Sequence, residues 1–379
     1  MVSNILDPTY HSNSRTEFKI FGRNRLLSSK MRVSSFGVSG VTIPLPAPQA
    51  TFNYEGGIKS LIKQASLYIN DILVDQVKDA SKVLSIEQNV MSSYDANNIA
   101  SKTACTSINP AWDAFEYAEL RNAPLQHKLL GHLSLESVFP LLKSISLLPD
   151  CYEIRIVFEY ETSIPVIFAA PRPTAFTVSE PKLIYDEVME MEKMAEAMKA
   201  PMSVIFPCVL TERLIASNSV GHQSIRLRAF DNMNLVRLVM NAVIGNTVDD
   251  ELCFSKSDVV AGEQINFRVN GATLLPFKGL DHPAKKLFTA ASSMQDHLSP
   301  LGGADGNFVA DAFDEVYVGG LDGAVLQKLA YTAVDVNTRV SRLDFELDKT
   351  LAQAVYYYIY GKVQKYFIKK GDVVETGYV

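Results

Sequence analysis

Two glutamates placed two positions apart, Glu159 and Glu161, are the side chains in this sequence best placed for acid–base chemistry. A pair of carboxyl groups on one strand face could hydrolyse a glycosidic bond. The residues around them alternate between apolar and polar types, however, and a solvent-facing strand surface accounts for both glutamates without catalysis. We therefore assign neither a catalytic role, and a glycosidase that uses Glu159 or Glu161 stays open as an alternative.

Other arrangements that could support chemistry are incomplete. Five acidic residues could gather around a calcium ion, although their spacing is not that of an EF-hand loop. They are Asp305, Asp311, Asp314, Glu315 and Asp322. No two of the six histidines form a His-x-His or His-Glu-x-x-His pair, and Gly37-Val38-Ser39-Gly40 is one residue short of a nucleophile elbow. We predict no enzyme activity, no catalytic, cofactor-binding or metal-binding residue, no cofactor and no small-molecule substrate.

Three short segments occur twice in the same order, which indicates an internal duplication. The first copies are Tyr68–Asp71, Asp113–Glu116 and Arg155–Glu161, and the second copies are Arg268–Gly271, Asp311–Asp314 and Arg342–Asp348. The copies are separated by 200, 198 and 187 residues, and the spacing shrinks along the chain. This is expected if one domain was doubled and the second copy then lost loop residues. We predict two copies of one β-domain.

The repeated segments have the alternation of half-buried strands. In Tyr152–Tyr160 the even positions are apolar or aromatic, and Glu153, Arg155 and Glu159 occupy odd positions. The segment around Phe345 and the segment Gln264–Val269 alternate in the same way. Strands with one dry and one wet face are typical of antiparallel sandwiches rather than of parallel sheets covered on both faces.

A few segments depart from this alternation. Val355–Tyr360 is apolar or aromatic on both faces, which predicts a strand buried on both sides, inside its domain or against a neighbouring subunit. Leu135–Leu142 has helical spacing but contains Pro140, so we expect at most a short helix. Ile184–Met198 carries a methionine-rich helical stripe, which predicts a helix connecting the two copies.

Length and charge limit the remaining possibilities. The 379 residues are too many for one ordinary core and suggest two domains. The net charge of −6 does not favour bulk binding of nucleic acid, whereas the first 32 residues carry a net charge of +4. The four cysteines form no Cys-x-x-Cys and are expected to be reduced core residues. We see no secretory signal and no membrane-spanning run in the sequence.

Two further stretches complete a recognisable pattern. One is Leu133–Phe139, which leads into the Tyr152–Glu161 strand; the other is Leu183–Val188, which precedes Met202–Leu214. With the repeated strands and the basic N-terminus, they resemble the double jelly-roll major capsid proteins of icosahedral double-stranded DNA viruses. That lineage runs from tailless phages to adenovirus hexons. The resemblance covers residues 31–370.

The resemblance implies an all-β fold of two tandem antiparallel eight-stranded jelly rolls in one chain, with short helices in the connections. We expect a basic N-terminal arm at 1–30, a first roll at 31–195, a second roll at 196–370 and a C-terminal tail at 371–379. It also implies a non-enzymatic coat protein that self-assembles as a pseudo-hexameric homotrimer, with the strand at Tyr356–Tyr360 as a candidate contributor to the subunit contact.

The resemblance further implies the partners and the location of the protein. The partners would be other copies of the chain, then neighbouring capsomers, and minor capsid or penton proteins. An inner membrane or the genome would be contacted through the basic arm. The protein would reside in the virion capsid after synthesis and assembly inside the host cell, without secretion through a signal peptide. The alternative from another class is a carbohydrate-binding or adhesive tandem β-sandwich protein, a receptor-binding spike or a lectin, in which Trp112 could stack on a sugar.

Overall fold

The computed structural model describes most of the chain. The described residues are 2–42, 52, 56–84, 129–168, 172–188, 201–215, 219–244, 260, 262–275, 279–281, 285, 289 and 332–379. The chain divides into two units. The first unit comprises Met1–Ser85, Asn97–Cys208 and Lys365–Gly377, and the second comprises Ile86–Ala96, Val209–Gln364 and Tyr378–Val379. The predicted boundary at 195/196 lies outside the described residues.

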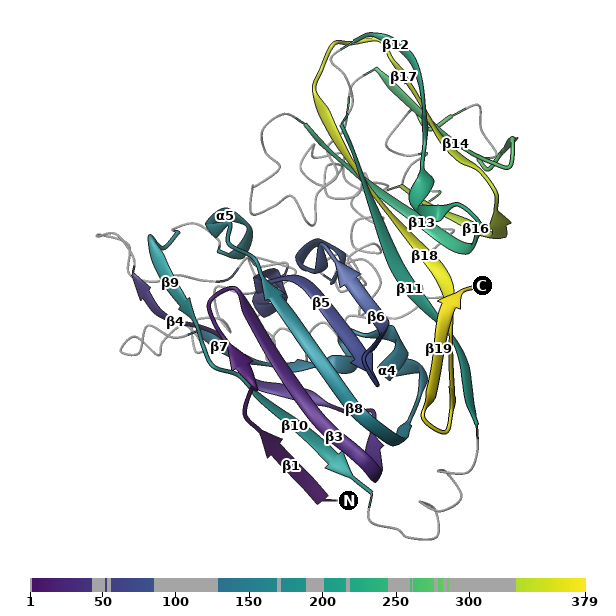
Figure 1. Cartoon of the computed structure of the whole chain (residues 1–379). Coiled ribbons are helices and arrows are strands. Elements are labelled where there is room, and N and C mark those ends of the chain that lie inside the picture. Colours follow the sequence, from purple (N-terminus) through teal and green to yellow (C-terminus); the bar gives the residue numbers. More distant parts are fainter. Residues whose placement is uncertain are drawn as a thin grey trace, which may run out of the picture. The chain divides into compact units, whose positions relative to one another are not determined.

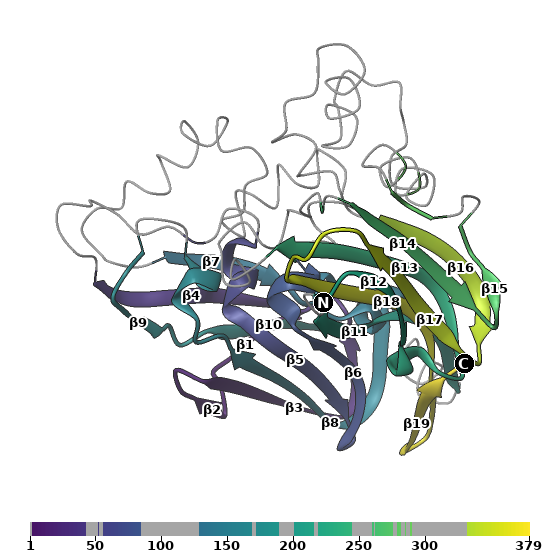
Figure 2. The ribbon, with the colours of Figure 1, turned by 90° about the horizontal axis from the view of Figure 1, so that it is seen from above.

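The described part of the second unit contains two antiparallel sheets (Figure 2). One sheet has the order β11-β18-β13-β16, with strands Met202–Ile215, Val355–Lys370, Met233–Ile244 and Thr332–Val340. The other has the order β12-β17-β14-β15, with strands Gly221–Arg226, Leu343–Lys349, Glu263–Val269 and Ala272–Thr273. Along the chain the strands alternate between the sheets, except that β14 and β15 form a hairpin within one sheet. This succession is that of an eight-stranded jelly roll.

The first unit repeats this succession strand for strand (Figure 1). One group of strands has the order β1-β10-β4-β7, with bounds Val2–Leu6, Lys182–Glu187, Arg32–Thr42 and Leu129–Ser134. The other has the order β3-β8-β5-β6, with bounds Arg15–Ser28, Leu147–Tyr160, Ile62–Ile69 and Ile72–Lys78. The short strands β2 (Tyr10–His11) and β9 (Ala175–Val178) are additions to this plan. The fold is therefore two tandem antiparallel jelly rolls, as predicted.

Aromatic side chains show how each roll closes on its core. In the first unit β10 joins β3 through a single residue pair, Glu187 and Leu27, so the two groups of strands are barely continuous. Phe36 on β4 nevertheless lies 5.5 Å from Phe158 on β8, ring centre to ring centre, although these strands are not neighbours in a sheet. The rings meet in the interior, where both are fully buried. Burial of such large apolar surfaces is the main stabilising contribution to each roll.

The prediction of a basic arm at residues 1–30 is wrong, because these residues form strands. Strand β1 pairs with β10 from Val2 opposite Glu187 to Leu6 opposite Leu183 (Figure 1). Strand β3 begins at Arg15 and pairs with β8 from Arg15 opposite Glu159 to Ser28 opposite Leu147. Residues 373–378 of the predicted C-terminal tail likewise form a strand, β19, which pairs with β18.

The predicted helices have mixed outcomes. The expected short helix is present as the 3-10 turn η2 (Leu135–Ser137) and the helix α4 (Pro140–Ser144), which begins at the proline. The methionine-rich helix is wrong at its start, because Ile184 lies in strand β10. Strands β1 and β4 both pair with this segment, and these tertiary hydrogen bonds outweigh a weak helical pattern. Residues 189–200 lie outside the described part.

The remaining short helical turns lie between strands. They are η1 (Gly57–Leu61), α5 (Ile164–Ile167) and η3 (Arg228–Phe230). Each follows or precedes a strand of its roll, which agrees with the prediction of short helices in the connections.

The aromatic strand is buried within a single chain. Tyr357 and Ile359 are fully buried, and Tyr358 and Tyr360 are each only 6 % exposed. Strand β18 also lies between β11 and β13 in its sheet, so its backbone hydrogen bonds are used internally. Of the two locations left open for this strand, the structure shows the interior for Tyr357–Tyr360, whereas Tyr356 is half-buried. The expected contribution of Tyr356–Tyr360 to a subunit contact stays a prediction.

Candidate interaction surface

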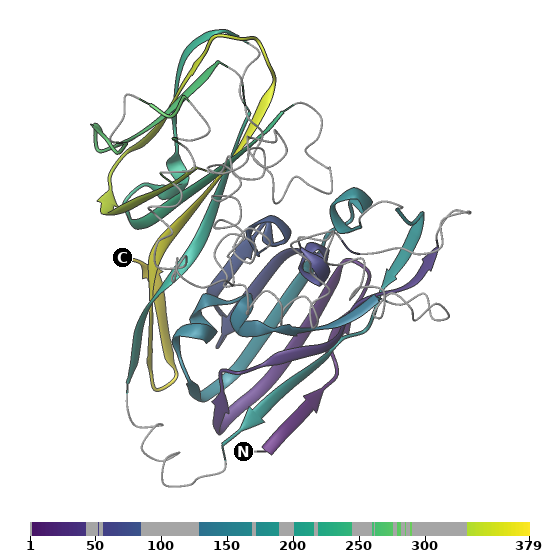
Figure 3. The same ribbon diagram turned by 180° about the vertical axis from the view of Figure 1, so that it is seen from behind.

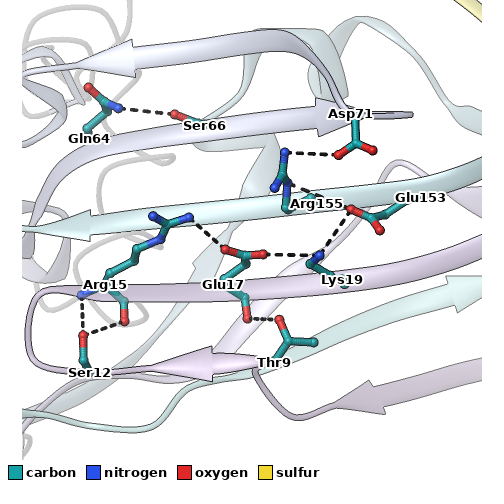
Figure 4. A network of polar contacts seen from close by, with 10 residues as sticks. All are labelled: Thr9, Ser12, Arg15, Glu17, Lys19, Gln64, Ser66, Asp71, Glu153 and Arg155. Atoms are coloured by element: carbon teal, nitrogen blue, oxygen red, sulfur yellow. Dashed lines mark hydrogen bonds and ion pairs between the residues drawn. The ribbon is translucent and has the colours of Figure 1, made fainter.

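A network of alternating charges covers one face of the first roll, on strands β3 and β8 and the turn after β5 (Figure 4). Arg15 Nη2 lies 2.8 Å from Glu17 Oε2, and Lys19 Nζ lies 3.7 Å from the other oxygen of Glu17. Across the strands, Lys19 lies 3.8 Å from Glu153, and Arg155 lies 3.3 Å from Asp71. Positive and negative groups therefore succeed each other over this face.

The strand alternation places these charges together. Antiparallel pairing sets Lys19 opposite Arg155, and residues two apart on a strand share a face. The backbone at the start of β3 is held as well. Thr9 Oγ1 donates a hydrogen bond to the Glu17 carbonyl at 2.9 Å, and Arg15 N donates to Ser12 Oγ at 3.1 Å. The charge network thus depends on both the register between β3 and β8 and the turn before β3.

This pairing changes the interpretation of the basic N-terminus. Arg15 and Lys19, which the sequence placed in an arm, face carboxylates of their own roll, and Arg25 pairs with Glu187 at 2.5 Å. Ion pairs this exposed are worth only about 0–1 kcal/mol each, so they neutralise the surface more than they stabilise it. The contact with a membrane or genome that was predicted through the arm stays a prediction, and strands rather than an arm would have to make it.

The second roll carries a corresponding network on its β12-β17-β14 sheet. Arg268 lies 3.1 Å from Glu346, and His222 Nδ1 lies 3.0 Å from Asp348. Arg342 lies 2.7 Å from Asp344. Because β17 and β8 hold the same place in the two rolls, both copies present a self-paired, polar sheet face.

The Asn70 and Asn270 turns form the clearest structural repeat. Asn70 and Asp71 have φ of 51° and 63°, and Asn270 and Gly271 have φ of 52° and 85°. Two consecutive residues in this left-handed region make a two-residue hairpin turn, for which Asn-Gly and Asn-Asp are well suited. The sequence match between Tyr68–Asp71 and Arg268–Gly271 is thus confirmed as a structural equivalence.

Each asparagine side chain fastens the strand that pairs with the one before its turn. Asn70 Oδ1 accepts from Tyr152 N at 2.9 Å and Glu153 N at 3.4 Å. Asn270 Oδ1 accepts from Ser341 N at 2.8 Å and Arg342 N at 3.1 Å. These hydrogen bonds tie the turn to β8 in one roll and to β17 in the other.

Backbone hydrogen bonds correct the register of the other strand repeat. Asn70 N donates to the Glu153 carbonyl, and Asn270 N donates to the Arg342 carbonyl. Glu153 and Arg342 are therefore equivalent, 189 positions apart, whereas the sequence match aligned Arg155 with Arg342. A shift of two residues keeps every side chain on the same face of its strand, so the sequence identified the right strands and faces in a wrong register.

Both rolls also bury a tyrosine hydroxyl that donates a hydrogen bond. Tyr160 donates to Thr16 Oγ1 at 2.7 Å in the first roll, and Tyr357 donates to the carboxylate of Glu263 in the second. Burial raises the pKa of both hydroxyls, and the negative charge of Glu263 raises that of Tyr357 further. Both tyrosines therefore stay neutral in the folded protein at neutral pH.

The candidate catalytic residues do not form a site in the described structure. Glu159 is half-buried on β8, between Arg15 on β3 and Gln64 on β5. Glu161 Oε1 accepts from Thr162 N at 2.9 Å and Ser163 N at 3.2 Å, which orders the turn before α5. Gly37–Gly40 lies within strand β4 and not in a strand-to-helix turn.

Several candidates cannot be placed. Trp112, the Asp-Ala-Phe repeats and the acidic residues from Asp305 to Asp322 lie outside the described residues. Within the described ranges, no three His, Cys, Asp or Glu side chains gather as a metal site would require. Those ranges also contain no helix of the length and apolar character needed to span a membrane.

Comparisons with known proteins give similarity in structure without similarity in sequence. No protein-family model matches the chain, and no curated protein matches its sequence. The match to the mavirus major capsid protein covers 99% of this chain and 90% of the mavirus chain, with a TM-score of 0.54 and 8% sequence identity. The match to a protein of the PBCV-1 virus capsid covers 100% of this chain and 97% of the PBCV-1 chain, with a TM-score of 0.52 and 11% sequence identity. The match to the Faustovirus major capsid protein covers 96% of this chain and 90% of the Faustovirus chain, with a TM-score of 0.53 and 9% sequence identity. The chain therefore has the double jelly-roll fold of these viral capsid proteins.

Proposed function

We propose that this chain is the major capsid protein of an icosahedral virus and assembles as a pseudo-hexameric homotrimer. The observation that carries the proposal is the identical strand succession in two rolls of one chain, matched over nearly its whole length by solved viral capsid proteins. Two similar rolls in each of three chains supply six similar building blocks. Such a trimer fills a hexagonal position in a shell with only threefold symmetry.

The proposal also covers partners and location. The protein resides in the virion capsid, where its first partner is itself and its next partners are neighbouring trimers and minor capsid or penton proteins. It assigns no membrane or genome contact to residues 1–30, because these residues belong to strands of the first roll. It needs no substrate and no cofactor, since the role of each chain is to fit against copies of itself.

A stable trimer requires large contacts between subunits. Obligate interfaces bury roughly 2,000 Å² or more and resemble a domain core cut in half. The aromatic strand β18 is already buried inside its own chain, so the proposal assigns the subunit contacts to other surfaces.

Sedimentation of the purified full-length protein tests the proposal. At micromolar concentration and physiological salt, we expect one species with three times the mass of the chain. Dilution to nanomolar concentration serves as the control, because an obligate trimer persists whereas a weak association dissociates. A monomer at micromolar concentration contradicts the proposal.

A further inference from the structure

The first unit includes residues that follow most of the second unit in sequence. Residues 365–377 belong to the first unit, although the whole stretch from Val209 to Gln364 lies in the second. They form the last part of β18 and most of β19 (Val373–Tyr378), the yellow hairpin in Figure 3. We call residues 365–377 the strap.

Polar contacts attach the strap to one edge strand of the first roll. Lys365 Nζ donates to the Val74 carbonyl on β6 at 2.7 Å. Asn70 Nδ2, in the turn just before β6, donates to the Asp372 carbonyl at 3.1 Å. Phe367 lies between these two contacts in sequence and is fully buried. The strap is therefore held at its first residue and at the turn of its hairpin, and a buried aromatic ring lies between these contacts.

The residue next to Val74 explains why the strap carries a lysine there. Asp75 is fully buried, and its Oδ2 accepts a hydrogen bond from Leu141 N at 3.0 Å. A buried carboxylate is costly unless a positive charge lies near it. Lys365, itself only 9 % exposed, interacts electrostatically with Asp75.

The groups around Asp75 respond as expected for one buried cluster. Burial lowers the pKa of Lys365, and nearby Cys208 and then Asp75 oppose that shift. Burial raises the pKa of the Cys208 thiol to about 12, with a further increase from Asp75. Cys208 therefore stays neutral at pH 7, whereas Lys365 is a cationic group that interacts with Asp75 in this cluster.

We infer that residues 365–377 act as a strap that locks the first roll, because Lys365 supplies the positive charge that buried Asp75 requires. The first roll reaches full stability only when the strap is docked. Asp75 belongs to the first unit, so the second roll does not depend on this charge.

The test compares amide hydrogen exchange in the two rolls of the full-length protein. Lys365→Met keeps most of the side-chain volume and leaves Asp75 without its charge partner. We expect exchange in β5 and β6 to accelerate about 100-fold, because breaking a buried pair leaves an uncompensated charge. Exchange in β12 and β14 of the second roll stays unchanged. Lys370→Met removes an exposed lysine from the same strand and is the matched control, with no effect in either roll.

A double variant separates the charge pair from general damage. Asp75→Asn with Lys365→Met removes both charges and keeps an acceptor for Leu141 N, so we expect most of the lost protection in β5 and β6 to return. If Lys365→Met is insoluble, a soluble double variant with a protected first roll supports the strap. Unchanged exchange in Lys365→Met overturns the inference, and so does a double variant as unprotected or insoluble as the single one.

Discussion

Asn70 and Asn270 occupy equivalent turns, but their side-chain amides hold different parts of the chain. Asn270 Nδ2 donates at 3.0 Å to the Arg339 carbonyl, in strand β16 of its own roll. Asn70 Nδ2 donates to the Asp372 carbonyl, 302 positions away. The second roll is thus closed by its own strands, whereas the first roll uses the C-terminal hairpin to complete the same arrangement.

The two buried tyrosines extend this comparison. Tyr160 donates to a neutral hydroxyl, and Tyr357 donates to a carboxylate. Lys349, which is 2 % exposed, lies near Glu263, whose negative charge opposes the lowering of the lysine pKa by burial. A charged cluster is therefore built into the interior of the second roll, while in the first roll the charged cluster lies where the strap docks.

Truncating a core aromatic tests whether the rolls are separate cores. Phe345 is fully buried and lies 5.5 Å from Phe267 and 5.2 Å from Tyr357, ring centre to ring centre. Phe345→Ala should cost about 3–5 kcal/mol through lost burial and a residual cavity. Hydrogen exchange should show the loss in β14 and β17 but not in β3 and β8.

The reciprocal variant is the control for this comparison. Phe158→Ala removes a buried ring of the first roll, which lies against Phe36, and should reverse the pattern. Equal loss of protection in both rolls from either variant would show a single shared core, contrary to the two-roll account.

Removing one hydroxyl from each roll sharpens the contrast between their interiors. Tyr357→Phe leaves the buried Glu263 carboxylate without this donor and should cost about 2–3 kcal/mol, whereas Tyr160→Phe should cost about 1 kcal/mol. Urea denaturation followed by signals from each roll measures both values. Equal costs would mean that the charge on Glu263 adds nothing to the hydrogen bond.

High pH should weaken the second roll through the same tyrosine. The pKa of Tyr357 is raised from 10.0, so above pH 10 the unfolded chain loses this proton while the folded chain keeps it. The contribution is complete below pH 10 and is then lost as the pH rises, at up to about 1.4 kcal/mol per pH unit. Stability of the second roll measured from pH 8 to 11 should fall less steeply in Tyr357→Phe. Parallel curves for the variant and the original protein would contradict this.

Replacing the turn asparagines by glycine gives the smallest of these effects. Glycine tolerates the positive φ, so Asn70→Gly and Asn270→Gly remove the side-chain hydrogen bonds without adding backbone strain. Each should cost about 1–2 kcal/mol in its own roll. Asn70→Gly alone should also speed exchange in β19, because it releases the Asp372 carbonyl; an equal effect of Asn270→Gly on β19 would erase the difference between the turns.

Much of this fold could be predicted because the rolls are built from strands with one dry face. The alternation in Tyr152–Tyr160 and around Phe345 identified β8 and β17, and the repeat of Tyr68–Asp71 as Arg268–Gly271 identified equivalent segments at the ends of β5 and β14. The register of the longer repeat was wrong by two residues, because alternation has a period of two and cannot distinguish registers that differ by that amount.

Other features depended on contacts between residues far apart in sequence. A run of positive charge in Arg15–Arg32 predicted an arm, since nothing local shows that Lys19 and Arg25 form ion pairs with Glu153 on β8 and Glu187 on β10. The strap was missed for the same reason. The sequence does not show that Lys365 binds the Val74 carbonyl next to the buried Asp75.

We propose that one chain supplies two equivalent rolls and that three chains join into a block of six. Negative-stain electron microscopy of the purified full-length protein tests this arrangement. We predict class averages with threefold symmetry and a six-lobed outline. Particles with two lobes, or assemblies without threefold symmetry, would contradict it.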